Sequence, residues 1–139
     1  MPRQESGQSL IEAILVSVLI LVPVLWAIGI LADLHRTALA TTSAAREAGF
    51  EAARSSSLTD AEGAAVRAVA AALRDHGLNP SRSDVDLSLS GLRRGAFVEV
   101  RVSYPVPVTQ VPLLGRVAGP AILVDAEHAT IIDPYRSRP

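Results

Sequence analysis

The sequence contains no cysteine and no lysine, and only 4% of its 139 residues are aromatic. Without cysteine the chain cannot form disulfides, bind zinc or iron-sulfur clusters through thiolates, or use a thiol nucleophile. All 13 basic residues are arginine, and they nearly balance 14 acidic residues to give a net charge of −1. This balance provides no basic field for a polyanion, so we expect no nucleic-acid partner.

Patterns typical of catalysis or cofactor binding are also missing. His35, His76 and His128 lie in separate segments, each without a second ligand at metal-binding spacing, so solvated histidines are expected. Asp84 and Asp86 fit the outward positions of a half-exposed strand. The sequence has no glycine-rich phosphate loop, nucleophile elbow or HExxH motif. We therefore expect no enzyme activity, no metal and no cofactor.

The main feature that is present is an uncharged apolar run of 19 residues, from Ala13 to Leu31. As an α-helix it would be about 28 Å long, close to the thickness of the hydrocarbon core of a bilayer. Pro23 lies inside the run, where it tends to kink a helix but is better tolerated in membranes than in water. Trp26 suits the approach to the outer interface. The run predicts a membrane-spanning helix.

Three fates are open to such a segment: removal as a signal peptide, retention as a plain anchor, or processing as a prepilin. The apolar run is longer than a usual signal-peptide core, and the obvious small-residue cleavage triplet, 38–40, lies well beyond its end, which disfavours removal. Arginines are more numerous after the run than before it, so the positive-inside rule alone does not favour a cytoplasmic N-terminus.

The residues before the run favour the prepilin fate. A short hydrophilic segment, 1–7, ends in Gly7, and Glu12 follows five residues later at the start of the apolar run. This pattern resembles the type IV prepilin signal. The resemblance implies that prepilin peptidase cuts between Gly7 and Gln8, that Glu12 sets the axial register of subunits, and that the C-terminal part lies outside. A boundary carboxylate is costly to bury unpaired, and the new amine of Gln8, in the same or a neighbouring subunit, is its natural counter-ion.

Beyond the run, an alanine-rich and proline-free stretch predicts that the helix continues out of the membrane until a turn at 55–57. Its small residues suit packing in an assembly, and a solvated stalk is an equal alternative. Thr59 and Glu62 form a capping box for a second helix that ends at Gly77. The helix has one apolar face, made of Val66, Val69, Ala70 and Leu73, and we expect this face to cover a sheet.

The remainder predicts strands. Segments 85–89 and 98–104 alternate with period two around a turn at 91–95, which favours an antiparallel hairpin. We expect Pro105 to Pro120 to form an irregular loop that touches a membrane or a partner. A third strand is expected from Ala121 to Ile132, with one face made of Ile122, Val124, Ala126, His128 and Thr130.

The predicted fold class is therefore α+β: a long N-terminal transmembrane helix that continues into an exposed helix, a second short helix, and a small antiparallel sheet of about three strands. The predicted organisation is a leader (1–7), a transmembrane and assembly helix (8–32), a helical extension (33–57) and an extracytoplasmic head (58–139).

This layout, with a valine-rich strand entering Tyr104-Pro105-Val106-Pro107, then Pro112 to Gly115 and a last strand through Asp125 to Ala129, is similar to that of the TadE-like proteins. These are minor pilins or pseudopilins of the Tad (Flp-type, type IV) pilus. The resemblance implies a subunit of the bacterial cytoplasmic membrane that reaches the pilus or cell surface after processing and serves assembly, adhesion or secretion. Implied partners are prepilin peptidase, the major Flp-type pilin, other minor pilins, the inner-membrane assembly platform and membrane lipid. An uncleaved single-pass protein with an extracytoplasmic binding domain is the alternative.

Overall fold

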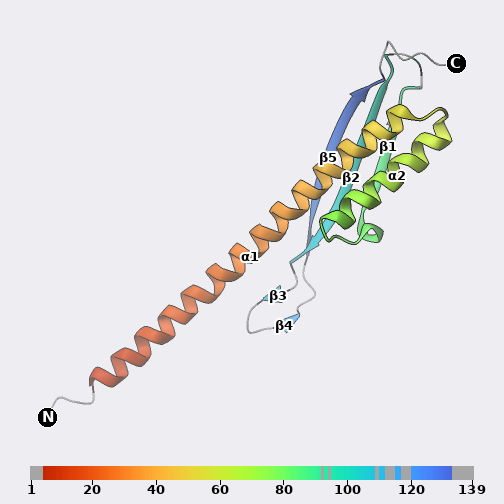
Figure 1. The fold of residues 1–139 in the computed structure, drawn as a ribbon. Coiled ribbons are helices and arrows are strands. Elements are labelled where there is room, and N and C mark those ends of the chain that lie inside the picture. The colour runs from red at the N-terminus through yellow and green to blue at the C-terminus, as the bar shows by residue number, and fades with distance from the viewer. Residues whose placement is uncertain are drawn as a thin grey trace.

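The computed structural model describes residues 5–91, 93, 95–108, 110–111, 115–116 and 120–132. Two helices, α1 (Glu5–Arg54) and α2 (Leu58–Asp75), lie on one side of a sheet, and the N-terminal half of α1 projects far beyond it (Figure 1). The α+β fold predicted from the sequence is confirmed. The short elements are the 3₁₀ turn η1 (Pro80–Arg82), β3 (Gln110–Val111) and β4 (Gly115–Arg116), and the long strands are β1 (Asp84–Leu89), β2 (Phe97–Pro107) and β5 (Ala121–Ile131).

The long strands form an antiparallel sheet in the order β1-β2-β5. The predicted hairpin is present, and its turn includes Gly91 and Gly95 at φ values of 120° and 76°, which glycine adopts without strain. The third strand is also present, with the even-numbered face of β5 turned toward α1 except at its exposed start, Ile122. Within the predicted loop, the structure pairs Gln110 with Arg116 and Val111 with Gly115. Residues 109, 112–114 and 117–119 of that prediction lie outside the described residues.

The prediction that the loop begins at Pro105 is wrong, because β2 continues to Pro107. Pro105 pairs with Leu123 and Pro107 with Ala121. The strand tolerates both prolines because β1 reaches only as far as Ser103, which leaves this end of β2 with an open edge. The carbonyl of Pro105 accepts a hydrogen bond from Arg82 at 3.1 Å, on the side of β2 where β1 lies. The nitrogens of both prolines face the same open edge, so their lack of an N–H group removes no hydrogen bond between β2 and β5.

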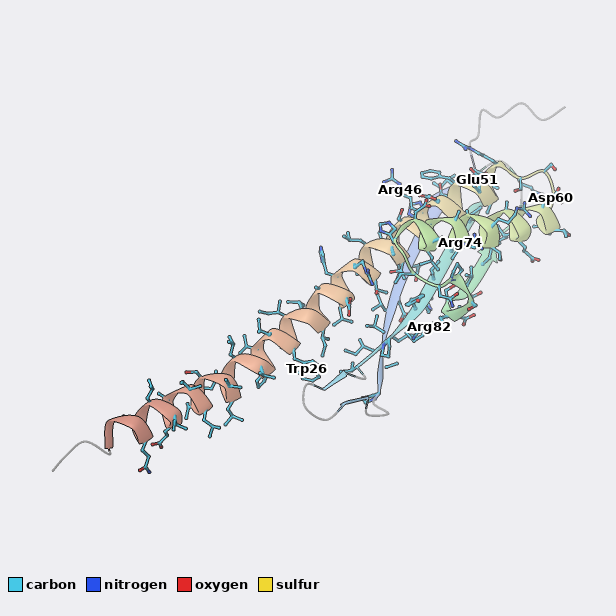
Figure 2. The ribbon with its side chains drawn as sticks, turned by 60° about the horizontal axis from the view of Figure 1, so that its bottom comes forward. Trp26, Arg46, Glu51, Asp60, Arg74 and Arg82 are labelled. Atoms are coloured by element: carbon cyan, nitrogen blue, oxygen red, sulfur yellow. The ribbon has the colours of Figure 1, made fainter. Side chains whose placement is uncertain are left out.

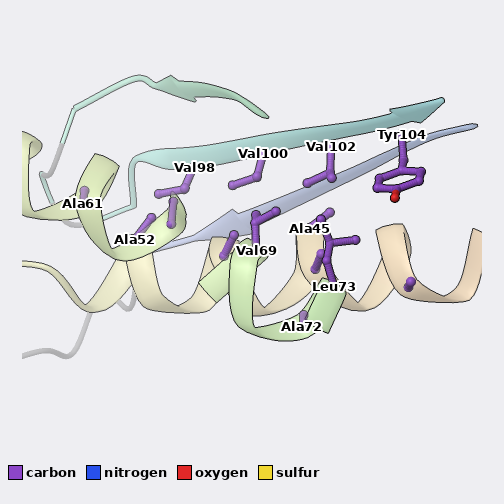
Figure 3. Close-up of a cluster of buried hydrophobic side chains, with 14 of the residues drawn as sticks. Ala45, Ala52, Ala61, Val69, Ala72, Leu73, Val98, Val100, Val102 and Tyr104 are labelled. Atoms are coloured by element: carbon purple, nitrogen blue, oxygen red, sulfur yellow. The ribbon is translucent and has the colours of Figure 1, made fainter. Parts of the chain in front are cut away.

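The core is formed by small residues of the helices and branched residues of β2. Val98, Val100, Val102 and Tyr104 point from β2 toward the helices (Figure 3). Opposite them runs a line of residues at three- or four-residue spacing along α1, here called the head-facing stripe: Trp26, Ile30, Leu34, Thr37, Ala40, Thr41, Ala44, Ala45, Ala48 and Ala52. From Thr37 onward each of these side chains is at most 2% exposed. The threonine hydroxyls are satisfied locally, with Thr37 donating to the Asp33 carbonyl at 2.8 Å and Thr41 to the Thr37 carbonyl at 3.0 Å.

This burial corrects the prediction for the helical extension. The alanine-rich part of α1 is not a solvated stalk, because the small side chains of the head-facing stripe are buried in the chain's own head, whereas Ala38 and Thr42 on the other side of the helix stay exposed. Small residues in the stripe let the axis of α1 approach α2 and the sheet closely.

The predictions for α2 need two corrections. The N-cap is Ser57, whose hydroxyl accepts from the Asp60 amide at 3.1 Å, and Thr59 lies inside the first turn. Val66 is 54% exposed, and the buried face is instead Ala61, Ala65, Val69, Ala72 and Leu73. That face packs mainly along α1 and reaches β1 only at its edge, so α1 rather than α2 covers most of the sheet. The predicted stop is correct: Gly77, at φ 72°, donates to the Arg74 carbonyl, and Leu78 donates to the Leu73 carbonyl.

Enlarging one residue of the head-facing stripe tests this packing. Ala44→Leu adds three carbons at a fully buried position, and overpacking of this kind destabilises a core by about 1–3 kcal/mol. We expect a lower unfolding midpoint in thermal and denaturant unfolding of the full chain in detergent, followed by circular dichroism. The matched control is Ala38→Leu, at an exposed position of the same helix, which should leave the midpoint nearly unchanged. Equal midpoints for the two variants would contradict the packing described here.

Candidate functional site

The three residues singled out from the sequence, Gly7, Gln8 and Glu12, all lie near the start of α1. The bond between Gly7 and Gln8 is in the first turn of the helix, which begins at Glu5. Helix ends fray, and the first turn has backbone amides without intrahelical partners, so this bond lies where the helix opens most readily. The predicted leader residues 1–4 lie outside the described residues.

Glu12 is exposed on α1. Among the residues that the structure describes, no basic side chain forms an ion pair with it. Glu12 follows Gln8 by four residues, which places both on one face of the helix, and helical side chains lean toward the N-terminus. The side chain of Glu12 therefore leans toward the turn that contains Gln8.

From Gln8 to Leu25 almost every side chain is exposed, although most of them are large and apolar. We call this segment the bare half of α1. Leu10, Leu15 and Leu19, for example, are 62%, 68% and 70% exposed, and Leu10 lies on the side of the helix opposite to Leu15 and Leu19. The part of α1 from Gln8 to Arg54 has a mean hydropathy of 2.9 over its best 18-residue window, and no residue of that window is buried. Among the described residues, α1 is the one helix that is long and apolar enough to cross a membrane.

Trp26 marks the change from the bare half to the covered half. It is the first residue of the head-facing stripe, and it lies where the ends of the strands come down beside α1 (Figure 2). Ile30 and Leu34 follow at four-residue spacing and are also partly covered. The head therefore begins before the apolar run ends at Leu31. Sequence reasoning missed this overlap because nothing local indicates where β2 and β5 return along the helix.

Pro23 lies inside α1, and the helix continues through it (Figure 1). Proline has no amide hydrogen, so the carbonyl of Leu19, one turn earlier, loses its usual helical donor. Despite this loss, Pro23 does not end α1, which continues to Arg54.

The histidines do not come together. No group of three or more histidine, cysteine or acidic side chains at metal-binding distance occurs among the described residues. The prediction of solvated histidines is wrong for His128 of β5, which packs against α1 with its ring 5.7 Å from that of Phe50. Its buried Nε2 has no hydrogen-bond partner. A Cβ at Gly49 would lie 3.0 Å from the His128 ring, so glycine allows this close approach.

The middle of the outer face of the sheet is polar, and Asp84 and Asp86 are exposed on this face as predicted. Arg101 donates a hydrogen bond to Glu127 across β2 and β5 at 2.6 Å. This bond and the charge of Arg101 hold the pKa of Glu127 below its usual range. The same bond and the charge of Glu127 raise the pKa of Arg101. The pair is exposed, so it contributes little to stability.

Comparison with protein-family models, curated proteins and solved structures found no match to this chain.

Proposed function

We propose that this chain is a minor pilin or pseudopilin of a Tad-type type IV pilus, anchored in the cytoplasmic membrane by α1 before assembly. The observation that carries the proposal is the division of α1 into a bare apolar half and a half covered by the head. Gly7 directly precedes the bare half and Glu12 lies near its start, in the spacing of a prepilin signal. A soluble protein would not expose so many large apolar side chains on one projecting helix.

The same division suits a subunit that leaves the bilayer for a filament. Both environments must cover the bare half on all sides, lipid in the first case and the helices of other subunits in the second. Subunits that join head to tail form an open-ended assembly, in which the bare half lies inside and the head outside. The major pilin, the other minor pilins and the assembly platform are the partners that this role requires.

Glu12 would have its role in assembly rather than in anchoring. After cleavage, Gln8 carries a free amine one turn before Glu12, and a subunit that inserts into a packed helical bundle must neutralise that carboxylate. The amine can belong to the same subunit or to a neighbouring one. A pair between two subunits is possible at one axial offset only, so it would fix the register.

Processing can be tested by the mass of the protein isolated from cells with and without prepilin peptidase. We expect the segment 1–7 to be lost only in cells that contain the peptidase. Gly7→Leu is the matched variant, because it changes the residue before the cut and leaves the anchor intact, and it should remain uncut in both strains. An intact N-terminus of the unchanged protein in both strains would contradict the proposal and favour the alternative, an uncleaved single-pass protein with a binding head.

The register role can be tested with Glu12→Ala. We expect cleavage to persist, while the amount of subunit in sheared filaments falls at least about tenfold. The reason is that the amine of Gln8 then has no counter-ion, and an unpaired charge in a packed interior costs several kcal/mol. Immunoblots of the filament and membrane fractions measure this ratio. Glu5→Ala is the control, because Glu5 belongs to the segment that is cut away and its loss should leave incorporation unchanged. Normal incorporation of Glu12→Ala would rule out the register role.

A further inference from the structure

A cleft of about 330 Å³ lies between α1 and the end of β2. We call this part of the molecule, where the head meets the apolar run of α1, the neck. Its walls are mainly apolar: Trp26 and Ile30 come from α1, Leu78 follows α2, and Val106 and Pro107 end β2. Gly29 also lines it, and a Cβ there would meet nothing within 4 Å, so the cleft has open space on the helix side. The cleft is at the small end of the range of roughly 300–1,000 Å³ that is typical of ligand sites.

The position of the cleft along α1 coincides with the end of the apolar run. Trp26, Gly29 and Ile30 belong to the run, whereas Asp33, Arg36 and Thr37, further along the same face of α1, lie beyond it. The exposed side chains of Asp33 and Arg36 form the polar rim of the cleft. If the run spans a bilayer, the apolar part of the cleft lies at the depth of the acyl chains and the polar rim lies at the surface.

The rim carries one cation that suits a phosphate. Arg36 is five residues beyond Leu31, which is about 7 Å further along the helix axis. The headgroup layer on each side of a bilayer is roughly 5–7 Å thick, so the guanidinium reaches the level of the lipid phosphates. Asp33 lies 3.8 Å from Arg36 and is a weak partner, because both side chains are more than half exposed. A phosphate with two accepting oxygens offers Arg36 a stronger, forked interaction.

The strand ends beside the cleft are apolar and exposed. Leu123 of β5 is 60% exposed and Ile122 is 41% exposed, and they pair with Pro105 and Val106 of β2. Neighbouring strand residues point to opposite faces, so Ile122 lies on the face toward α1 and Leu123 on the outer face. Each face of the sheet therefore has an exposed apolar side chain at the end beside the cleft.

We propose that the neck cleft binds one phospholipid of the outer leaflet, with an acyl chain between Ile30 and the end of β2 and the phosphate on Arg36. This lipid site rests on the membrane anchoring proposed above. It seals the gap between the head and the bilayer, which α1 alone leaves open at this level. It also fixes the height of the head, because the phosphate on Arg36 holds the neck at the membrane surface.

The experiment uses the full chain, one copy per nanodisc, in a bilayer of phosphatidylethanolamine and phosphatidylglycerol whose acyl chains carry a photoactivatable diazirine. After irradiation, the labelled residues are mapped by peptide mass spectrometry. We expect labels on the bare half of α1 and, on the head, at Leu78 and Val106 to Val108. Phe97 and Ile131 are an internal control, because they are each 56% exposed but lie at the opposite end of the sheet, and they should stay unlabelled.

Two variants separate binding in the cleft from casual contact with lipid. Gly29→Leu fills the cleft from the helix side, and we expect it to reduce the labels on the head about tenfold, because an occupied cleft has no room for an acyl chain. Ala27→Leu, at an exposed position that does not line the cleft, should leave them unchanged. Arg36→Gln should reduce them about threefold to tenfold through loss of the charged hydrogen bonds, and Arg36→Lys should restore part of the signal.

The outcomes distinguish the two proposals. Labels on the bare half of α1 but not on the head would overturn the lipid site and leave the membrane anchor standing. Head labels that persist in Gly29→Leu at the level of Ala27→Leu would also overturn the site, since lipid would then touch the head without entering the cleft. The absence of labels from α1 would overturn the anchor and the lipid site together. Circular dichroism of each variant confirms that the fold is retained, and glycine-to-leucine substitution favours the helix.

Discussion

The structure depends on one constraint: a single continuous helix must satisfy two different surroundings along its length. Over the bare half, α1 is apolar on every side and the chain provides nothing to cover it. Over the other half, the head covers the head-facing stripe, and alanine side chains bring α1 close to α2 and to the valines of β2. Both halves share one helix axis, so the position of the head along that axis is set by where the stripe begins.

The stripe begins at Trp26, inside the apolar run, so the neck combines the last apolar turns of the run with the first residues covered by the head. A head that started beyond Asp33 would stand clear of the membrane on a helical stalk. The observed head instead comes down beside the last turns of the run, where the ends of β2 and β5 and the neck cleft lie. If the run spans a bilayer, as proposed, these parts lie at the level of the lipid headgroups, and the subunit would exchange lipid for protein there as well as over the bare half on assembly.

The parts of the fold that follow from strong local patterns could be predicted from the sequence. An uncharged apolar run of 19 residues is long enough to favour a helix of membrane-spanning length, and period-two alternation around Gly91 and Gly95 fixes the hairpin. The alanines of the stripe could not be placed, because alanine is compatible with solvent, a core or a helix interface. Pro105 and Pro107 were misplaced because their tolerance depends on the open edge of β2, which is a tertiary property. The candidate processing residues were found by motif alone, whereas the cleft needs the return of β2 along α1.

The most direct test of this account is the accessibility of three positions on α1 to a thiol reagent, since the chain has no cysteine of its own. Leu19→Cys, Leu39→Cys and Ala44→Cys would each be treated with a membrane-impermeant maleimide, present on both sides of proteoliposomes, before and after unfolding in detergent. The account predicts reaction at position 39 at once, at position 19 only after the bilayer is dissolved, and at position 44 only after the head unfolds. Reaction at position 19 in intact proteoliposomes, or at position 44 in the folded head, would contradict the division of α1 between lipid and head.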